Sequence, residues 1–273
     1  MPHPPPHIGR RPALVTGGSS GIGRSTALAL AAAGHPVVLG ARRLDRCQDT
    51  AALIGERGGE AHALKVDLAD AGSLSRFVAA AAEPFGPIEV LVSAAGDVLP
   101  TRAVDTEPDA FAAQVELNLL GVQRLCSAVV PGMVQRERGD VVLITSDVVR
   151  APRPMMSSYV ASKWGLEGLA RVMQMELERT GVRVSMVRPG PTLTGMGMDW
   201  EPDVTEAVLA EWQRWGLVRH GGYLSPDAVA AAVRAVVSAP RGSHWALIEL
   251  QPEAPLKRRP RTGPPDQKEA STT

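Results

Sequence analysis

Seven short apolar runs alternate with longer segments of helical composition, and this alternation constrains the fold more than any other feature of the chain. The runs span 13–16, 37–41, 61–66, 88–93, 140–145, 182–187 and 245–250. Strands that alternate with helices across short connections predict a parallel sheet covered by helices on both faces. Right-handed crossovers then give a doubly wound, Rossmann-like α/β fold that binds ligands outside the carboxyl ends of its strands. We predict one domain over residues 11–251, because a chain of 273 residues can bury one large core.

A glycine-rich turn separates the first predicted strand from the first predicted helix. Thr16-Gly17-Gly18-Ser19-Ser20-Gly21-Ile22-Gly23 follows an apolar run, and an Ala- and Leu-rich run leads on to Gly34. Glycines let the backbone approach a pyrophosphate, and a helix N-terminus offers free N–H groups and the positive end of a dipole. The context predicts a phosphate-binding turn, with an ordinary Gly/Ser loop as the alternative. The TGxxxGxG spacing departs from the generic GxGxxG fingerprint.

Tyr159 and Lys163 lie four residues apart, a spacing that places both on one face of a helix. A phenol with an ordinary pKa of about 10 is a poor proton donor or acceptor at neutral pH. A cation beside it favours the phenolate and lowers the pKa of the phenol toward the working range. A surface polar pair is the alternative, and the glycine-rich turn upstream favours a catalytic pair.

Together these motifs resemble those of the short-chain dehydrogenase/reductase family, in family order and spacing over roughly residues 12–250. The residues that carry the resemblance are Thr16-Gly17…Gly21-Ile22-Gly23, Ser93-Ala94-Ala95-Gly96, Asn118, Ser146, Tyr159, Lys163 and Pro189-Gly190. The resemblance implies an oxidoreductase that transfers a hydride between a nicotinamide dinucleotide and an alcohol or carbonyl substrate.

The resemblance also implies roles for individual residues. Tyr159 would be the general acid and base, and Lys163 would lower its pKa and bond the nicotinamide ribose. Ser146 is similar to the family serine that holds the substrate oxygen. Asn118 is similar to the asparagine that supports a water relay to the lysine, and structural support of its helix is the alternative. Asp147 stands where many relatives carry serine, and we assign it no catalytic role.

The end of the second strand predicts which dinucleotide binds. Arg42 and Arg43 follow the strand, and the acidic residue that suits a free ribose 2′-hydroxyl is missing there. Arginine suits a 2′-phosphate, so we expect NADP(H); in the alternative, both arginines are surface charges and NAD(H) binds weakly. Asp67 matches the family position that approaches the adenine amino group, and it could also cap the helix that starts near Asp70.

By the same resemblance, the cofactor site gathers the turns that follow the strands. Its predicted members are Gly17, Ser19, Ser20, Gly21, Ile22, Gly23, Arg42, Arg43, Asp67, Leu68, Ala94, Ala95, Gly96, Tyr159, Lys163, Pro189, Gly190, Thr192 and Thr194. Thr192 and Thr194 are the candidates to face the nicotinamide carboxamide. Ser93 stands where the family usually carries asparagine; its hydroxyl can still bond backbone groups, but it does not offer the two-sided amide contact that steadies the central sheet in the family.

Residues 191–225 form a long excursion between the last two predicted strands, which predicts a lid or binding loop. Three of the five tryptophans lie there, and methionine and tryptophan suit an adaptable apolar cover for a hydrophobic substrate. Alternatively, Trp212 and Trp215 pin the segment to the core. Residues 1–10 are expected to be flexible, and the proline-rich residues 252–273 are expected to be disordered.

Composition and charge argue against several classes of partner. The 29 basic and 29 acidic residues balance, so no nucleic acid or anionic membrane is expected. No apolar run of 18 residues predicts a membrane span, and the first seven residues lack the apolar core of a signal peptide. We therefore expect a cytoplasmic protein in which Cys47 and Cys126 are free thiols. No His/Cys/Asp cluster has metal-ligand spacing, so no metal is expected.

The segment 164–177 is apolar on nearly every face, which predicts burial on more than one side and a homodimer or homotetramer. Two other functions remain open: a non-catalytic dinucleotide-binding sensor or scaffold, and an epimerase or dehydratase on the extended version of the fold. The sensor class typically lacks the tyrosine or the lysine, and the compact length argues against the epimerase. The substrate itself stays open.

Overall fold

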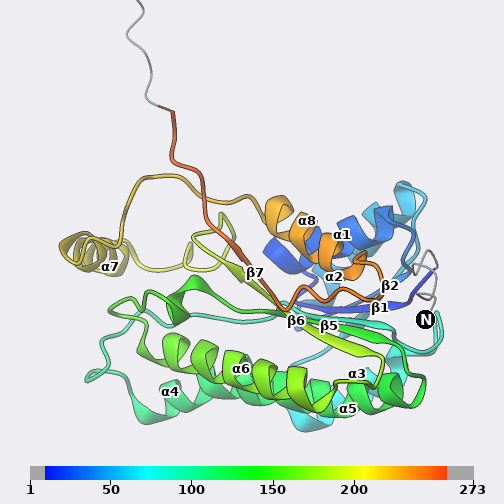
Figure 1. Ribbon diagram of the computed structural model, residues 1–273. Helices are drawn as coiled ribbons and strands as arrows, with labels where there is room; N and C mark the ends of the chain where they lie inside the picture. Colours follow the sequence, from blue (N-terminus) through cyan, green and yellow to red (C-terminus); the bar gives the residue numbers. More distant parts are fainter. Residues whose placement is uncertain (1–9, 257–273) are drawn as a thin grey trace, which may run out of the picture.

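A computed structural model describes residues 10–256 and shows a parallel sheet between two helical layers (Figure 1). The seven strands are β1 (Ala13–Thr16), β2 (Val37–Ala41), β3 (Ala61–Lys65), β4 (Val90–Ser93), β5 (Gly139–Ile144), β6 (Val182–Pro189) and β7 (Leu247–Leu250). Their order is β3-β2-β1-β4-β5-β6-β7, and every neighbouring pair is parallel. The predicted doubly wound fold is confirmed. Strands β2 and β3 extend the sheet on one side of β1, and strands β4 to β7 extend it on the other side. Folds of this kind open a ligand crevice at this switch point, between β1 and β4.

The helices cover both faces of the sheet. One layer contains α1 (Gly21–Ala32), α2 (Leu44–Glu56) and α8 (Pro226–Val237). The other contains α3 (Ala71–Ala81), α4 (Pro108–Val115), the π-helix η1 (Glu116–Leu120), α5 (Gly121–Gln135) and α6 (Ser157–Glu176). A short 3₁₀ helix, η2 (Asp147–Val149), follows β5, and α7 (Pro202–Arg214) lies apart from both layers (Figure 1).

The central strands β1 and β4 are apolar up to their last residues, Thr16 and Ser93, because helices cover both of their faces. Side chains alternate between the faces of a strand. Leu14 of β1 and Leu91 of β4 join the cluster beneath α3, α5 and α6, whereas Val15 and Val92 join the cluster beneath α1 and α8. All four side chains are fully buried. The sheet is thus a rigid platform whose carboxyl ends carry the connecting turns.

One long helix bears on the expectation that the chain has no membrane-spanning segment. Pro108–Gln135, which runs through α4, η1 and α5, is long and apolar enough to cross a membrane by length and composition, with a mean hydropathy of 1.3. The absence of a continuous apolar run had predicted no such segment. However, 44% of the apolar window is buried inside the protein, and α5 packs against α3 and β5. Core helices have the same composition, so this is weak evidence for a membrane.

The ends of the chain contribute little to the described fold. Residues 252–256 form no helix or strand. The predictions for residues 1–9 and 257–273 lie outside the described residues.

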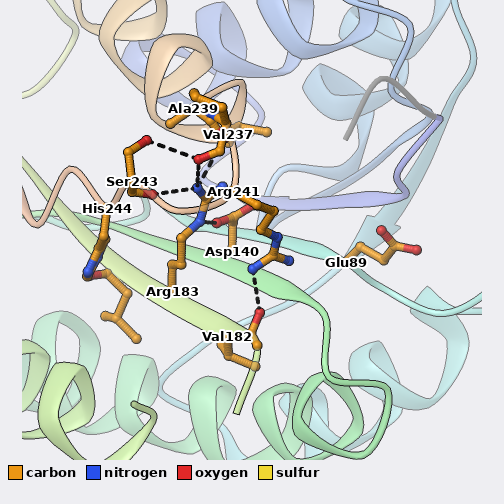
Figure 2. A network of polar contacts seen from close by, with 12 residues as sticks. Glu89, Asp140, Val182, Arg183, Val237, Ala239, Arg241, Ser243 and His244 are labelled. Carbon is orange, nitrogen blue, oxygen red and sulfur yellow. Dashed lines mark hydrogen bonds and ion pairs between the residues drawn. The ribbon is translucent and has the colours of Figure 1, made fainter. Parts of the chain in front are cut away.

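A buried ionic network joins the elements at the amino ends of the strands (Figure 2). The Asp140 carboxylate, near the start of β5, accepts hydrogen bonds from Arg11 at 2.5 Å and from Arg183 of β6 at 2.6 and 3.1 Å. Arg11 is fully buried and also donates to the Val237 carbonyl at the end of α8. Arg183 donates to the carbonyls of Ala239 and Ser243, which Figure 2 shows beside it.

Arg11→Met should therefore lower the free energy of unfolding by about 3–5 kcal/mol, because breaking a buried ion pair from one side leaves its partner incompletely compensated. Urea unfolding would measure the loss. The neighbouring Arg10 pairs with Glu60 at an exposed site, so Arg10→Met is the matched control and should cost less than about 1 kcal/mol. Equal losses in the two variants would contradict the structural role of Arg11.

Candidate functional site

A cavity of about 590 Å³ lies at the carboxyl ends of the strands and is lined by the turns that follow β1, β2, β4, β5 and β6. Of the predicted site residues, all but two line it. The exceptions are Asp67 and Asn118, and Asn118 is fully buried. Ser146, Tyr159 and Lys163 therefore share one cavity with the glycine-rich turn and with the two arginines that follow β2.

The glycine-rich turn fits a pyrophosphate. Gly17 has a φ of +76°, which favours glycine, and a Cβ on Gly23 would lie only 2.3 Å from the Gly17 carbonyl oxygen. Ser20 precedes α1 in an extended conformation and forms no side-chain capping bond. The N-cap residue therefore leaves the first N–H groups of α1 available, which is the arrangement that binds anions at helix N-termini.

Two cations stand at the carboxyl end of β2. Arg42 and Arg43 both line the cavity, and Arg43 donates to the Ser20 hydroxyl at 3.3 Å. The acidic residue nearest to them, Asp45, lies in the first turn of α2 and does not line the cavity. This charge distribution suits a phosphate on the adenosine ribose better than a free 2′-hydroxyl.

Asp67 does not cap α3. Asp70 is the N-cap, and its carboxylate accepts from the Ser73 N–H at 2.9 Å. The Asp67 carboxylate instead accepts from the Ala69 N–H at 3.0 Å, while its neighbour Leu68 lines the cavity. The capping alternative was wrong because the helix begins beyond the reach of Asp67. The contact of Asp67 with an adenine amino group stays a prediction.

Tyr159 and Lys163 occupy one face of α6 as predicted, and both are buried. The Lys163 Nζ donates to the Ile144 carbonyl at 3.0 Å and lies 5.6 Å from the centroid of the Tyr159 ring. Burial lowers the pKa of Lys163 to about 8. Burial also raises the pKa of Tyr159, and the Ser146 hydroxyl opposes that shift. This direction is opposite to the one predicted from the spacing, because desolvation of the phenol is the largest effect.

Asn118 supports the loop that follows β4. Its Oδ1 accepts from the Asp97 N–H at 3.0 Å, and its Nδ2 donates to the Asp97 carbonyl at 2.9 Å and to the Ser162 hydroxyl at 3.2 Å. A Cβ on Gly96 would lie 3.2 Å from the Asn118 Oδ1 and 3.6 Å from the Lys163 Nζ. The structural role is thus present, and the water relay stays a prediction. Asn118 sits in a π-helical turn, a feature that occurs frequently at functional sites.

Ser93 does not make the backbone bonds expected of it. Its hydroxyl is buried and has no hydrogen-bond partner among residues 10–256, and the same holds for the Thr16 hydroxyl. These two residues face each other in register across β1 and β4. The short serine side chain therefore leaves the centre of the sheet without the amide contact typical of the family position.

The structure adds an ion pair that the sequence did not reveal. Arg153 donates from both terminal nitrogens to the two oxygens of Asp147, at 2.8 and 2.7 Å, and its guanidinium lies 5.4 Å from the ring centroid of Trp212. All three residues line the cavity. Arg153 lies in an irregular segment, where no periodicity points to an inward side chain. Asp147 was noticed in the sequence but given no role.

The predicted lid, residues 191–225, contains α7, and backbone hydrogen bonds join its first residues to its last. Leu224 donates to the Pro191 carbonyl at 2.8 Å and accepts from the Leu193 N–H at 2.9 Å. The Trp212 indole donates to the Pro154 carbonyl at 3.0 Å, so this tryptophan both pins α7 and lines the cavity. Trp215 is 65% exposed, which contradicts the expectation that it pins the segment.

Comparisons with known proteins agree with this geometry. The model of the short chain dehydrogenase family matches residues 11–205. A 3-oxoacyl-[acyl-carrier-protein] reductase of a Synechocystis strain is 34% identical over 85% of this chain and 91% of its own length. A glycine betaine reductase of Emericella nidulans is also 34% identical, over 91% of this chain, but the chain spans only 19% of that protein.

Solved structures give the same picture. An alcohol dehydrogenase from Thermococcus sibiricus complexed with 5-hydroxy-NADP matches with a TM-score of 0.76 and 31% identity, covering 89% of this chain and 96% of its own. A variant of actinorhodin polyketide ketoreductase with NADPH matches with a TM-score of 0.78 and 30% identity, covering 90% of this chain and 98% of its own.

Proposed function

The chain belongs to the short-chain dehydrogenase family and is an oxidoreductase that uses NAD(P), and we propose that it transfers a hydride between NADP(H) and an alcohol or carbonyl group of a small substrate. The observation that carries the proposal is the meeting of Ser146, Tyr159 and Lys163 with the glycine-rich turn in one cavity. Val148, Met156, Trp200 and Trp212 line that cavity and belong to the apolar cluster around Tyr159, which suits an apolar substrate.

The proposed proton chemistry rests on three side chains. The nicotinamide, when bound, supplies or accepts the hydride. Tyr159 gives a proton to the substrate oxygen during reduction and takes it back during oxidation, and Ser146 orients that oxygen. Lys163 places a partly desolvated cation beside this machinery, where it favours the phenolate. The glycine-rich turn, with Pro189, Gly190, Thr192 and Thr194 opposite, would hold the cofactor. The pairing of Tyr159 with Lys163 favours an enzyme over a sensor.

The preference for NADP(H) is supported by Arg42 and Arg43 and by the absence of an acidic residue at the end of β2. Relatives of similar fold crystallised with NADP(H) support it further.

We also propose a homodimer or homotetramer built on α6. Trp164, Val172 and Met175 are 57%, 50% and 74% exposed and share one face of that helix with Gly168. Exposed apolar patches of this kind mark interfaces, and a symmetric dimer would pair this face with the same face of a second copy across a twofold axis.

The first prediction tests the proton donor. Tyr159→Phe should lower kcat for reduction of a ketone panel by roughly 10²–10⁴-fold, because it removes the acid without changing the cavity, and NADPH affinity should change little. Tyr223→Phe removes the hydroxyl of the chain's other tyrosine, which is 59% exposed, and should cost far less. Near-normal turnover by Tyr159→Phe would reject the proposed function.

The second prediction tests cofactor choice. Arg42→Ala should weaken NADPH binding about ten- to a hundredfold, as expected for a lost charge-assisted contact, and leave NADH binding nearly unchanged. Titration of cofactor fluorescence would measure both. Arg46→Ala, an exposed arginine of α2 that does not line the cavity, is the control. Equal losses for NADPH and NADH would argue against a 2′-phosphate contact.

The third prediction concerns assembly. Light scattering at micromolar concentration should give the mass of a dimer or tetramer, and Val172→Glu should shift it toward the monomer by placing a charge in the buried face. A wild-type protein of monomeric mass would contradict the proposed interface.

A further inference from the structure

We propose that Asp147 and Arg153 act as a positioning pair for the proton donor: Arg153 balances the Asp147 carboxylate beside Tyr159, so that proton transfer depends on the pair and not on either charge alone. This inference rests on the proposed function, because it concerns the proton chemistry of the same cavity.

The pair is built as a unit. Asp147 directly follows Ser146, just after β5. Arg153 donates hydrogen bonds to both carboxylate oxygens of Asp147, at 2.8 and 2.7 Å. Their side chains are only 8% and 11% exposed. Among residues 10–256, a further side-chain hydrogen bond to the carboxylate comes from the Gln251 amide at 3.5 Å. Charges in such a poorly hydrated place act more strongly on their neighbours than surface charges do.

The lid helix holds Arg153 in place. The guanidinium lies over the Trp212 ring at 5.4 Å, and the Trp212 indole is bonded to the Pro154 carbonyl at 3.0 Å. Trp212 in turn packs against the apolar cluster that contains Met156 and Tyr159. Cation–π contact and packing thus couple the position of the pair to the ring of the proton donor.

The charges around Tyr159 come from three elements. Asp147 from η2 raises the pKa of Tyr159, and Arg153 from the loop before α6 lowers it, so the two oppose each other; burial and the Ser146 hydroxyl are the larger effects. Lys163 from α6 lies 5.6 Å from the ring centroid.

Two more charged groups lie near this region but are engaged elsewhere. The Asp97 carboxylate lines the cavity and accepts from the Val98 N–H at 2.9 Å. Arg150 pairs with Glu249 at 3.0 Å and lines a neighbouring cavity only. Neither group therefore replaces the balance between Asp147 and Arg153.

The two single variants should have opposite effects. Arg153→Met leaves the Asp147 carboxylate unbalanced, which disfavours the phenolate and moves phenolate formation to higher pH. Asp147→Asn leaves the Arg153 cation unbalanced, which moves phenolate formation to lower pH. The double variant removes both charges, so the pH at which the Tyr159 phenolate forms should return close to that of the parent protein.

Spectroscopic titration of Tyr159 tests this without a substrate. The chain has only two tyrosines, so Tyr223→Phe leaves Tyr159 as the single phenol that gives a phenolate difference spectrum. In that background and with NADP⁺ bound, the two single variants should shift the titration midpoint in opposite directions, Arg153→Met to higher pH and Asp147→Asn to lower pH. The pH profile of kcat for oxidation of 1-phenylethanol should shift in the same directions.

Two matched variants serve as controls for the titration. Arg150→Met removes an arginine from the same segment, and its 67% exposed side chain pairs away from Tyr159, so the midpoint should not move. Arg153→Lys retains the cation and should shift the midpoint less than Arg153→Met does. Circular dichroism at each pH confirms that the fold persists across the titration.

Single variants that shift the midpoint in the same direction, or not at all, would overturn the inference, as would a double variant displaced as far as either single one. If this happens while Tyr159→Phe abolishes turnover, only the inference fails. Full turnover by Tyr159→Phe would instead reject the proposed function itself.

Discussion

A buried carboxylate held between two guanidinium groups is the constraint on which the arrangement of the sheet depends. Asp140 binds Arg11 before β1 and Arg183 on β6, and these two arginines also bond carbonyls at and after the end of α8. The network fastens elements far apart in sequence at the amino ends of the strands (Figure 2). Strands aligned at one end present their turns together at the other, and the candidate site is made of those turns.

The site combines close backbone approach with a few buried charges. Gly17 and Gly23 bring the first turn tightly onto itself, and Asn118 holds the loop after β4 next to Lys163. Burial then raises the pKa of Tyr159 and lowers that of Lys163, so each group is moved toward its neutral form. In such surroundings a balanced pair such as Asp147 and Arg153 matters, because a single unbalanced charge would act on the phenol with little screening.

Local pattern predicted some features and missed others for a physical reason. Side chains on regular elements point in directions set by the period of the element, so Tyr159 and Lys163 could be placed on one face of α6 in advance. Arg153 and Trp212 meet across an irregular segment and a lid helix, and no period governs such contacts. The π-helical turn at Asn118 likewise depends on neighbours that are distant in the chain, and so does the Ser93 hydroxyl, which has no hydrogen-bond partner among residues 10–256.

The amino-acid sequence alone determined the alternation of strands and helices and the glycine-rich turn, because periodicity and glycine placement are local properties, whereas the residues around the cavity were predicted from the resemblance to the family. Only the tertiary structure decided the direction of the pKa shift of Tyr159 and the pairing of Asp147 with Arg153. It also decided that Trp212 both fixes α7 and lines the cavity, and that Trp215 is exposed. These depend on burial and on distances between remote segments. Desolvation and ion pairing act through space, and a linear pattern does not contain the distances that set their strength.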